Sequence, residues 1–147
     1  MKLRNGKVAE QSDERARWVE RETLIEASPE EVWEALTDED RLEEWLAPDV
    51  ELDPHEGGEI SVRDGDDERR GTVETMEENE RFTFTWSRPG EGESFVEFTI
   101  EALPGGSRVT VVETPVGSTA IGPTAMAFGF GPGLLRLSHI LRFALVA

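Results

Sequence analysis

The chain has 147 residues, of which 37% are hydrophobic and 32% are charged, and its formal net charge is −17. This size and composition fit one soluble globular domain with a core of its own. The acidic excess excludes nucleic acid and an anionic membrane surface as partners, because both require clustered cations. The absence of cysteine excludes disulfides, thiolate catalysis and cysteine-based zinc sites.

The distribution of apolar and charged residues bears on where the protein works. No run of about 18 apolar residues occurs, and the N-terminus lacks the apolar core of a signal peptide. We therefore expect no membrane insertion and a cytoplasmic location. All thirty-two acidic residues lie before Pro115, and the charged side chains after it are Arg136 and Arg142. The sequence thus predicts an acidic body joined to an apolar C-terminal element.

The N-terminal part of the chain predicts an arm and a strand. Residues 1–16 show mixed charge and no periodicity, so we expect a mobile N-terminal arm. The remaining residues, 17–147, are predicted to form a single domain. Residues 17–26 alternate weakly and are predicted to form its first strand, extended and half polar.

Two short helices are predicted next. Ser28 is a favourable N-cap, Pro29 occupies a position where a missing N–H costs nothing, and Glu31 completes a capping box. Thr37 or Asp38 then caps a second helix. Its apolar residues recur at i, i+3 and i+4 spacing, at Leu42, Trp45 and Leu46.

Six further strands are predicted from alternating residues between turn-forming clusters such as H-E-G-G and P-G-G-S. The clearest alternation puts Phe82, Phe84 and Trp86 on one face of a strand. The next strand repeats the pattern with apolar residues at every second position from Val96 to Ile100. The six predicted strands lie at 49–53, 59–63, 70–76, 81–87, around 96–100, and at 108–114.

A Gly/Pro-rich stretch at 115–133 leads to a predicted final helix from Leu134 to about Leu145. At 100° per residue, Arg136, His139 and Arg142 lie mostly on one side of this helix. One helix laid across a seven-stranded antiparallel sheet is an α+β architecture, and it often leaves a space between helix and sheet. The apolar side of the helix consists of Leu134, Leu137, Ile140, Leu141, Ala144 and Leu145.

Six blocks of sequence keep the order and approximate spacing of a known family. They are A-S-P-E-E-V-W-E-A-L-T-D at 27–38, L-E-E-W-L at 42–46, G-G-E-I at 57–60, G-T-V-E at 71–74, F-T-F-T-W at 82–86 and S-R-V-T-V-V-E at 107–113. Through these blocks the chain resembles the START-like, or SRPBCC, superfamily, and within it the branch related to the C-terminal domain of the Hsp90 ATPase activator Aha1. After Thr114 the chain departs from the pattern of that branch.

The resemblance implies a helix-grip fold with a cavity between the sheet and the C-terminal helix. In many members this cavity takes apolar or amphipathic ligands. The superfamily also includes lipid carriers, hormone receptors, aromatic polyketide cyclases and chaperone activators, so the resemblance does not imply one chemistry.

The four tryptophans have different expected roles. Trp33 is predicted to lock the first helix to the sheet, and Trp18 to cover a strand edge. For Trp45 and Trp86, core packing and ligand contact both remain open. Trp45 ends the short second helix, where folds of this kind tend to have the mouth of their cavity.

No metal or cofactor site is predicted. His55 and His139 are not flanked by a metal-ligand pattern. The acidic cluster at 64–68 suggests a calcium loop, but Arg69 and Thr75 occupy the positions where an EF-hand needs glycine and glutamate. We expect a solvated hairpin turn there instead.

Three strand carboxylates, Glu74, Glu97 and Glu113, decide whether catalysis is plausible. Each alternates against apolar neighbours, which favours a water-facing and inert side chain. A bulge or a shift of one residue would turn such an acid inward. Burial would then raise its pKa and make it a candidate general acid.

The function that the sequence favours is binding of a small hydrophobic or amphipathic molecule, with no catalytic residue required. Affinity would come from apolar area buried in the cavity. The predicted ligand-binding residues are Trp45 near the entrance, Phe82, Phe84, Trp86, Val96, Phe98 and Ile100 on the sheet, and Leu137 and Leu141 on the final helix.

Two alternatives remain open. A filled cavity with an exposed apolar patch would favour an Hsp90-activator-like protein-interaction module. A buried His–Glu or Arg–Glu pair would favour an enzyme similar to polyketide cyclases or dehydratases. An exposed apolar face on the C-terminal segment would also allow a homodimer or a chaperone partner.

Overall fold

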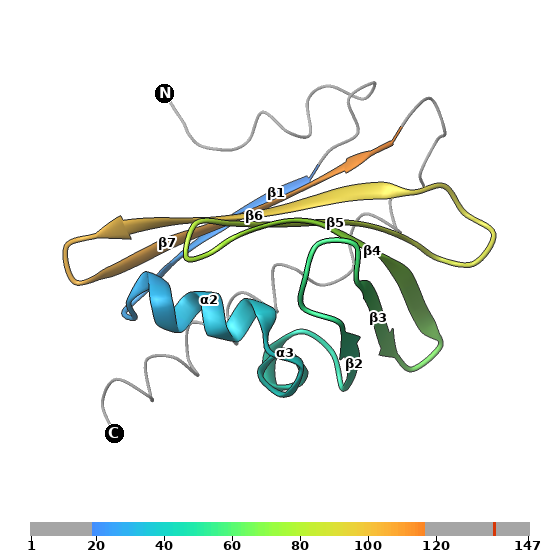
Figure 1. The fold of residues 1–147 in the computed structure, drawn as a ribbon, viewed down its shortest axis with the longest axis horizontal. Helices are drawn as coiled ribbons and strands as arrows, with labels where there is room; N and C mark the ends of the chain where they lie inside the picture. The colour runs from blue at the N-terminus through green and yellow to red at the C-terminus, as the bar shows by residue number, and fades with distance from the viewer. Residues whose placement is uncertain (1–18, 117–136, 138–147) are drawn as a thin grey trace.

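Seven antiparallel strands and two short helices make up the described part of the chain, which in this computed structural model is residues 19–116 and Leu137 (Figure 1). The strand order is β1-β7-β6-β5-β4-β3-β2. Strands β2 to β7 therefore form a meander of hairpins, and β1 completes the sheet beside β7. The elements are β1 (Val19–Ile25), α2 (Pro29–Thr37), α3 (Glu39–Trp45), β2 (Asp49–Leu52), β3 (Glu59–Asp64), β4 (Asp67–Glu77), β5 (Arg81–Ser87), β6 (Ser94–Leu103) and β7 (Gly106–Pro115).

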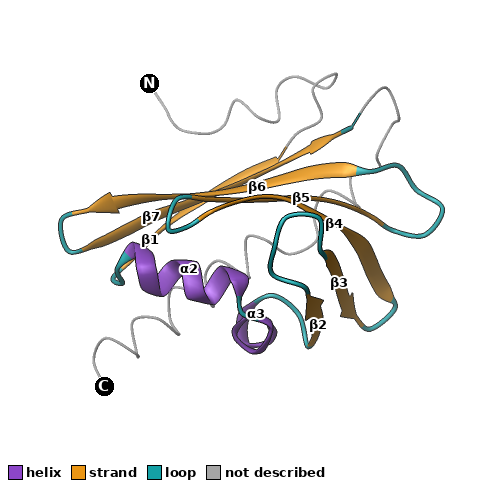
Figure 2. Cartoon of the chain, in the orientation of Figure 1, coloured by secondary structure: helices purple, strands orange, loops and turns teal. Residues whose placement is uncertain are grey.

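This arrangement confirms the predicted α+β class, the seven-stranded antiparallel sheet and the two helices after the first strand. Both helices lie on the same side of the curved sheet (Figure 2). Of the predicted final helix, only Leu137 is among the described residues, where it is helical and completely buried. The rest of that helix and the predicted arm at 1–16 lie outside the described residues. Within the described ranges, no helix combines the length and apolar character needed to cross a membrane.

The first helix begins as its sequence predicts. Ser28 Oγ accepts a hydrogen bond from the backbone N–H of Glu31 at 3.2 Å, and Glu31 Oε1 accepts one from the N–H of Ser28 at 3.3 Å. This reciprocal capping box satisfies two N–H groups that the helix itself cannot pair. Of the two predicted caps for the second helix, the structure uses Asp38, whose Oδ1 accepts from the N–H of Asp40 at 2.9 Å.

The two helices are joined by a buried hydrogen bond as well as by the chain. Trp45 Nε1 donates to the backbone carbonyl of Ala35 at 2.9 Å. Ala35 lies in the last turn of α2, where carbonyl groups have no partner within the helix. The indole at the end of α3 therefore completes the C-terminal end of α2.

One glycine position fixes the contact between β4 and β5. Gly71 pairs with Trp86, and a Cβ atom at position 71 would lie 1.6 Å from the carbonyl oxygen of Thr85. Any larger residue would force the two strands apart. Two residues further on, the register of this pair shifts between Val73 and Thr75 at a bulge.

Strand β4 begins earlier than predicted. Asp64 pairs with Asp67 across a tight turn, and Gly65 takes a left-handed backbone conformation with φ of 63°. As a result β4 begins at Asp67, within the acidic cluster, and not at Arg70. Arg69 becomes a strand residue, which places its side chain on the core face of the sheet.

The hydrophobic core lies between the concave face of the sheet and the two helices. Alternation along β5, β6 and β7 sends every second side chain to this face. Trp33, predicted to lock the first helix to the sheet, is partly buried and meets Phe82 edge to face at a centroid distance of 6.3 Å.

Candidate functional site

The structure gathers the predicted ligand-binding residues in one cluster. Apart from Leu141, which lies outside the described residues, all of them belong to a single hydrophobic cluster and none is more than 9% exposed. Phe84 is the centre of the aromatic group, 5.1 Å from Trp86 and 5.4 Å from Phe82 between ring centroids. The buried members are Trp45, Phe82, Phe84, Trp86, Val96, Phe98, Ile100 and Leu137. Their role in binding a ligand stays a prediction.

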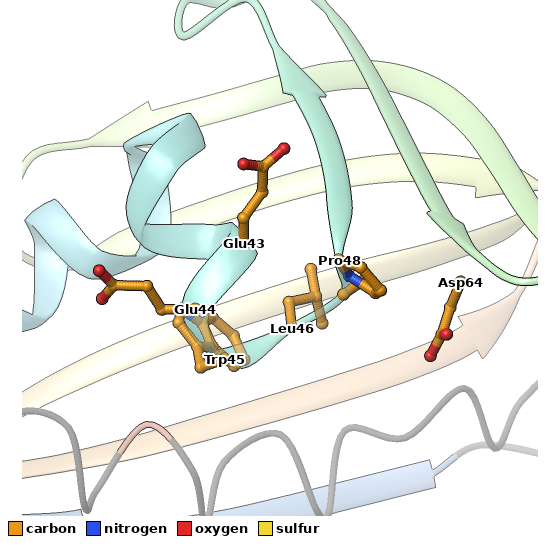
Figure 3. A pocket seen from close by; sticks show the side chains of 7 residues that line it. Glu43, Glu44, Trp45, Leu46, Pro48 and Asp64 are labelled. Carbon is orange, nitrogen blue, oxygen red and sulfur yellow. The ribbon is translucent and has the colours of Figure 1, made fainter.

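Trp45 combines a core position with a place beside a pocket. It is 1% exposed and meets Phe98 edge to face at 6.1 Å. It also borders an open pocket of about 340 Å³, where Figure 3 shows it together with Leu46 and the carboxylates of Glu43, Glu44 and Asp64. Three acidic side chains around one pocket do not suit an apolar ligand.

A second open pocket, of about 550 Å³, lies between the start of α2 and the β4–β5 turn. Pro29, Arg81 and Ile100 line it together with polar residues that include two glutamates. Both pockets open to solvent and mix acidic with apolar lining. Neither has the enclosed apolar character that the sequence predicts for the cavity.

Glu113 is the main departure from the sequence prediction. Its side chain is 1% exposed and lies in phase with Val109 and Val111 on the core face of β7. The prediction of a water-facing acid is therefore wrong for Glu113. It is confirmed for Glu74, which is exposed, and for Glu97, which lies on the outer face and pairs with Arg81 at 2.5 Å.

Two neighbouring strands supply hydrogen-bond donors to Glu113. Its Oε2 atom accepts from Trp86 Nε1 at 2.8 Å and from Ser94 Oγ at 2.5 Å. Trp86 and Ser94 pair directly across β5 and β6, so their side chains lie on the same face. Within the part of the chain that the structure describes, the other oxygen, Oε1, has no hydrogen-bond partner.

Arg69 brings a positive charge to the same buried cluster. It is 1% exposed, and its Nη1 atom lies 3.9 Å from Glu113 Oε2. Its guanidinium carbon stands 5.2 Å from the centre of the Trp86 ring, a cation–π distance. Asp67 then contacts both Arg69 and Arg88, with 3.3 Å from its Oδ1 to the Nε atom of each.

Burial raises the pKa of Glu113 above the ordinary value for a glutamate. The hydrogen bonds from Ser94 and Trp86, and the charge of Arg69, act in the opposite direction but do not cancel the effect of burial. A buried acid with a raised pKa, set against aromatic rings, can accept a hydrogen bond from a ligand or exchange a proton with it.

The predictions on metal binding concern residues outside this cluster. Among the described residues, no group of three or more potential ligands is placed to hold a metal ion. His55 is exposed in its turn, as expected, and its Nδ1 atom lies 3.1 Å from Asp53. His139 lies outside the described residues.

Sequence reasoning missed Arg69, and it named Glu113 but favoured the wrong face for it. Arg69 follows four acidic residues, and this context favours a solvated turn. Glu113 follows two valines, and alternation against the nearer one, Val112, placed it on the water-facing side. No local pattern could have paired the two residues, because they lie on different strands, β4 and β7, that are far apart in the sequence.

Comparison with known proteins places the fold in context. A model of the family described as activator of Hsp90 ATPase homolog 1-like protein matches residues 26–142. No curated protein matches the chain significantly.

Solved structures share the fold. CalU16 from Micromonospora echinospora is 22% identical, with a TM-score of 0.71 over 89% of this chain and 80% of that one. The Aha1 dimer from Colwellia psychrerythraea is 21% identical, with a TM-score of 0.70 over 84% of this chain and 95% of that one. DynU16, a protein of the dynemicin biosynthetic locus, is 27% identical with a TM-score of 0.74, over 86% of this chain and 48% of its own length.

Proposed function

This chain belongs to the family of activator of Hsp90 ATPase homolog 1-like proteins, and we propose that it binds a small apolar or amphipathic molecule against the concave face of its sheet. The observation that carries the proposal is the aromatic face of β5 and β6 with one acid–arginine pair set into it. Small-molecule sites are mostly apolar and use a few placed polar groups for orientation.

The residues proposed to contact the ligand include Trp45 near the entrance, and Leu137 and Leu141 opposite the sheet. The sheet residues, which form the aromatic face of β5 and β6, are Phe82, Phe84, Trp86, Val96, Phe98 and Ile100. Burial of apolar area, at about 25 cal/mol per Å², would supply most of the affinity. The likeness to a protein of a biosynthetic locus, at 27% identity, supports a small molecule as the partner.

The test is a binding screen of the full chain with fatty acids, sterols and aromatic polyketides. Tryptophan emission reports binding, since Trp45 and Trp86 both belong to the proposed site, and native mass spectrometry detects a co-purified molecule. If no compound changes the emission and no bound molecule is found, the proposed function fails.

A matched pair of variants locates the binding face. Phe98 lies on the core face of β6, whereas Phe95 lies on its outer face and is only half buried. Phe98→Leu should weaken binding of any compound found in the screen, and Phe95→Leu should leave it unchanged. Equal effects of the two substitutions would contradict a site on the concave face.

Catalysis is the second candidate function, favoured by one observation. The buried pair of Arg69 and Glu113 provides an acid with a raised pKa inside the proposed site. An enzyme similar to polyketide cyclases or dehydratases would use Glu113 as its general acid. Mass spectrometry of each bound compound after incubation would reveal conversion, and Glu113→Gln should abolish it.

The described surface gives less support to a protein-interaction module. Among the described residues, the exposed large hydrophobic side chains are Leu24, at 62%, and Val116, at 38%. They form no broad apolar patch of the kind that marks a protein-docking surface. Light scattering of the full chain would test the remaining possibility of a homodimer.

A further inference from the structure

One oxygen atom sets Glu113 apart from the other buried polar groups around it. Its Oε2 atom is engaged by Trp86 and Ser94, while Oε1 is buried and has no hydrogen-bond partner within the described part of the chain. A buried acceptor left unpaired is costly, so such an atom in a native structure calls for an explanation. A ligand that donates a hydrogen bond to Oε1 would supply its partner.

The position of Glu113 in the fold suits this role. It lies beside the start of β6, near the β5–β6 loop, whereas in Figure 1 α2 lies toward the opposite end of the sheet and α3 beneath its middle. The surroundings of the acid are aromatic, since Trp86 donates to it and Phe84 contacts Trp86. An aromatic ligand would find edge-to-face or offset partners there.

The charges around Glu113 limit the ligand to an uncharged group. Within the buried part of the cluster, Glu113 has the charge of Arg69 opposite it, while Asp67 contacts both Arg69 and Arg88, and Arg88 also pairs with the more exposed Glu91. A cationic ligand at Glu113 would meet the guanidinium of Arg69, and an anionic ligand would meet two carboxylates. Burying either charge without a new partner is unfavourable.

From these three observations we infer that Glu113 Oε1 accepts a hydrogen bond from the hydroxyl group of an uncharged aromatic ligand. The carboxylate is positioned by Ser94, Trp86 and Arg69. These three residues contact Oε2, which leaves Oε1 to the ligand. This inference rests on the proposed binding function and names the class of molecule that the site takes.

The experiment compares two probes that differ in the hydrogen-bond donor and in one methyl group. 2-Naphthol carries a hydroxyl group, and 2-methoxynaphthalene replaces it with an ether that cannot donate. Binding to the full chain is measured by calorimetry at about pH 8.5, well above the ordinary pKa of a glutamate. The wild-type protein should bind 2-naphthol about tenfold more tightly, as expected for a hydrogen bond to a charged acceptor.

Glu113→Gln should remove this preference. The amide retains an acceptor for Trp86 and Ser94, but its nitrogen replaces Oε1 and can donate to either the hydroxyl or the ether oxygen. The ratio of the two affinities should fall to about one. Glu97→Gln makes the same chemical change one strand away on the outer face, and it should keep the wild-type ratio.

The possible results separate this inference from the proposed function. If wild type binds both probes equally, or if Glu113→Gln keeps the preference, the inference is overturned while ligand binding stands. If neither probe binds although the screen finds other ligands, the inference is overturned and the binding function stands. If the screen finds no ligand either, both fail.

A second measurement applies if Glu113→Gln does not fold. Lowering the pH should reduce the preference of the wild-type protein, because a protonated Oε1 donates to the ether oxygen as readily as to the hydroxyl. A preference that does not change with pH would then overturn the inference.

Discussion

At the scale of single residues, Arg69 has more effect on the core than its surroundings in the sequence suggest. Its guanidinium stands over Trp86 and 3.9 Å from the Glu113 carboxylate. Arg69→Met should lower the free energy of unfolding by about 3–5 kcal/mol, because it leaves the acid buried without its opposite charge. Urea denaturation at neutral pH measures the change.

The next residue is the control. Arg70 has a side chain that is 74% exposed and pairs with Glu68, so Arg70→Met should cost about 0–1 kcal/mol. Combining Arg69→Met with Glu113→Gln should restore part of the lost stability, since no charge is then buried alone. If Arg69→Met and Arg70→Met lowered the free energy of unfolding equally, the buried ion pair would contribute no more to stability than the exposed one.

Glu113 should also make stability depend on pH. Because the pKa of its carboxyl is raised above 4.5 by burial, the folded state holds the proton more tightly than the unfolded state does. This contribution is fully present below the unfolded pKa and is lost as pH rises through the folded pKa. Glu113→Gln has no proton to lose, so its unfolding free energy relative to wild type should rise over that interval.

Thermal or urea unfolding of both proteins, measured across this pH interval, gives the difference between their free energies of unfolding. The titration of the other acids cancels in that difference. Glu97→Gln is the matched control. A difference between Glu113→Gln and wild type that is independent of pH would contradict the burial effect.

The two strand acids on β6 and β7 show where sequence reasoning reaches its limit. Glu97 lies between Val96 and Phe98, so strict alternation correctly predicts that it faces outward. Glu113 follows Val111 and Val112, which are both apolar yet lie on opposite faces. Its actual partners, Trp86 and Ser94, come from two other strands, and a contact over such a separation is not visible in the local pattern.

At the scale of elements, the start of α2 depends on two reciprocal hydrogen bonds. Ser28→Ala removes the acceptor for the N–H of Glu31 and should cost about 1 kcal/mol of stability. Ser28→Asp should keep most of the stability, because aspartate also caps a helix. Chemical denaturation compares the three proteins, and an alanine variant as stable as the aspartate variant would contradict the role of the cap.

Most elements could be predicted because nearby residues in the sequence determine where each helix or strand begins and ends. The cap at Ser28 and the turns rich in glycine set boundaries that the structure reproduces to within a few residues. The exception, β4, starts at Asp67 because Gly65 allows a tight turn inside a cluster of acids. The acidic residues suggested a solvated loop there, but hydrogen bonding to β3 makes Asp67 to Arg69 part of strand β4.

At the scale of the whole molecule, the net charge of −17 opposes compactness. Like charges repel one another more strongly in the folded state than in the expanded one, and salt screens this repulsion over distances of about 10 Å at 0.1 M. The melting temperature should therefore rise as sodium chloride is added. A fall would mean that the ion pairs on the outer face outweigh the repulsion.

The overall architecture followed from the order of short hairpins, since consecutive antiparallel strands with short loops become neighbours in a sheet. The candidate site was predictable only in its apolar part. Alternation identified the aromatic face around Phe84, but the acid and the arginine at its edge depend on tertiary packing.

The hydrogen bond from Trp45 to Ala35 has a consequence for local unfolding. The bond joins the end of α3 to the last turn of α2, ten residues earlier, and it is buried. Neither helix can unwind at that point without leaving a polar group unpaired in the core, so opening one exposes the other to the same cost. The two short helices therefore form a single cooperative unit, which resists fraying although each is too short to be stable alone.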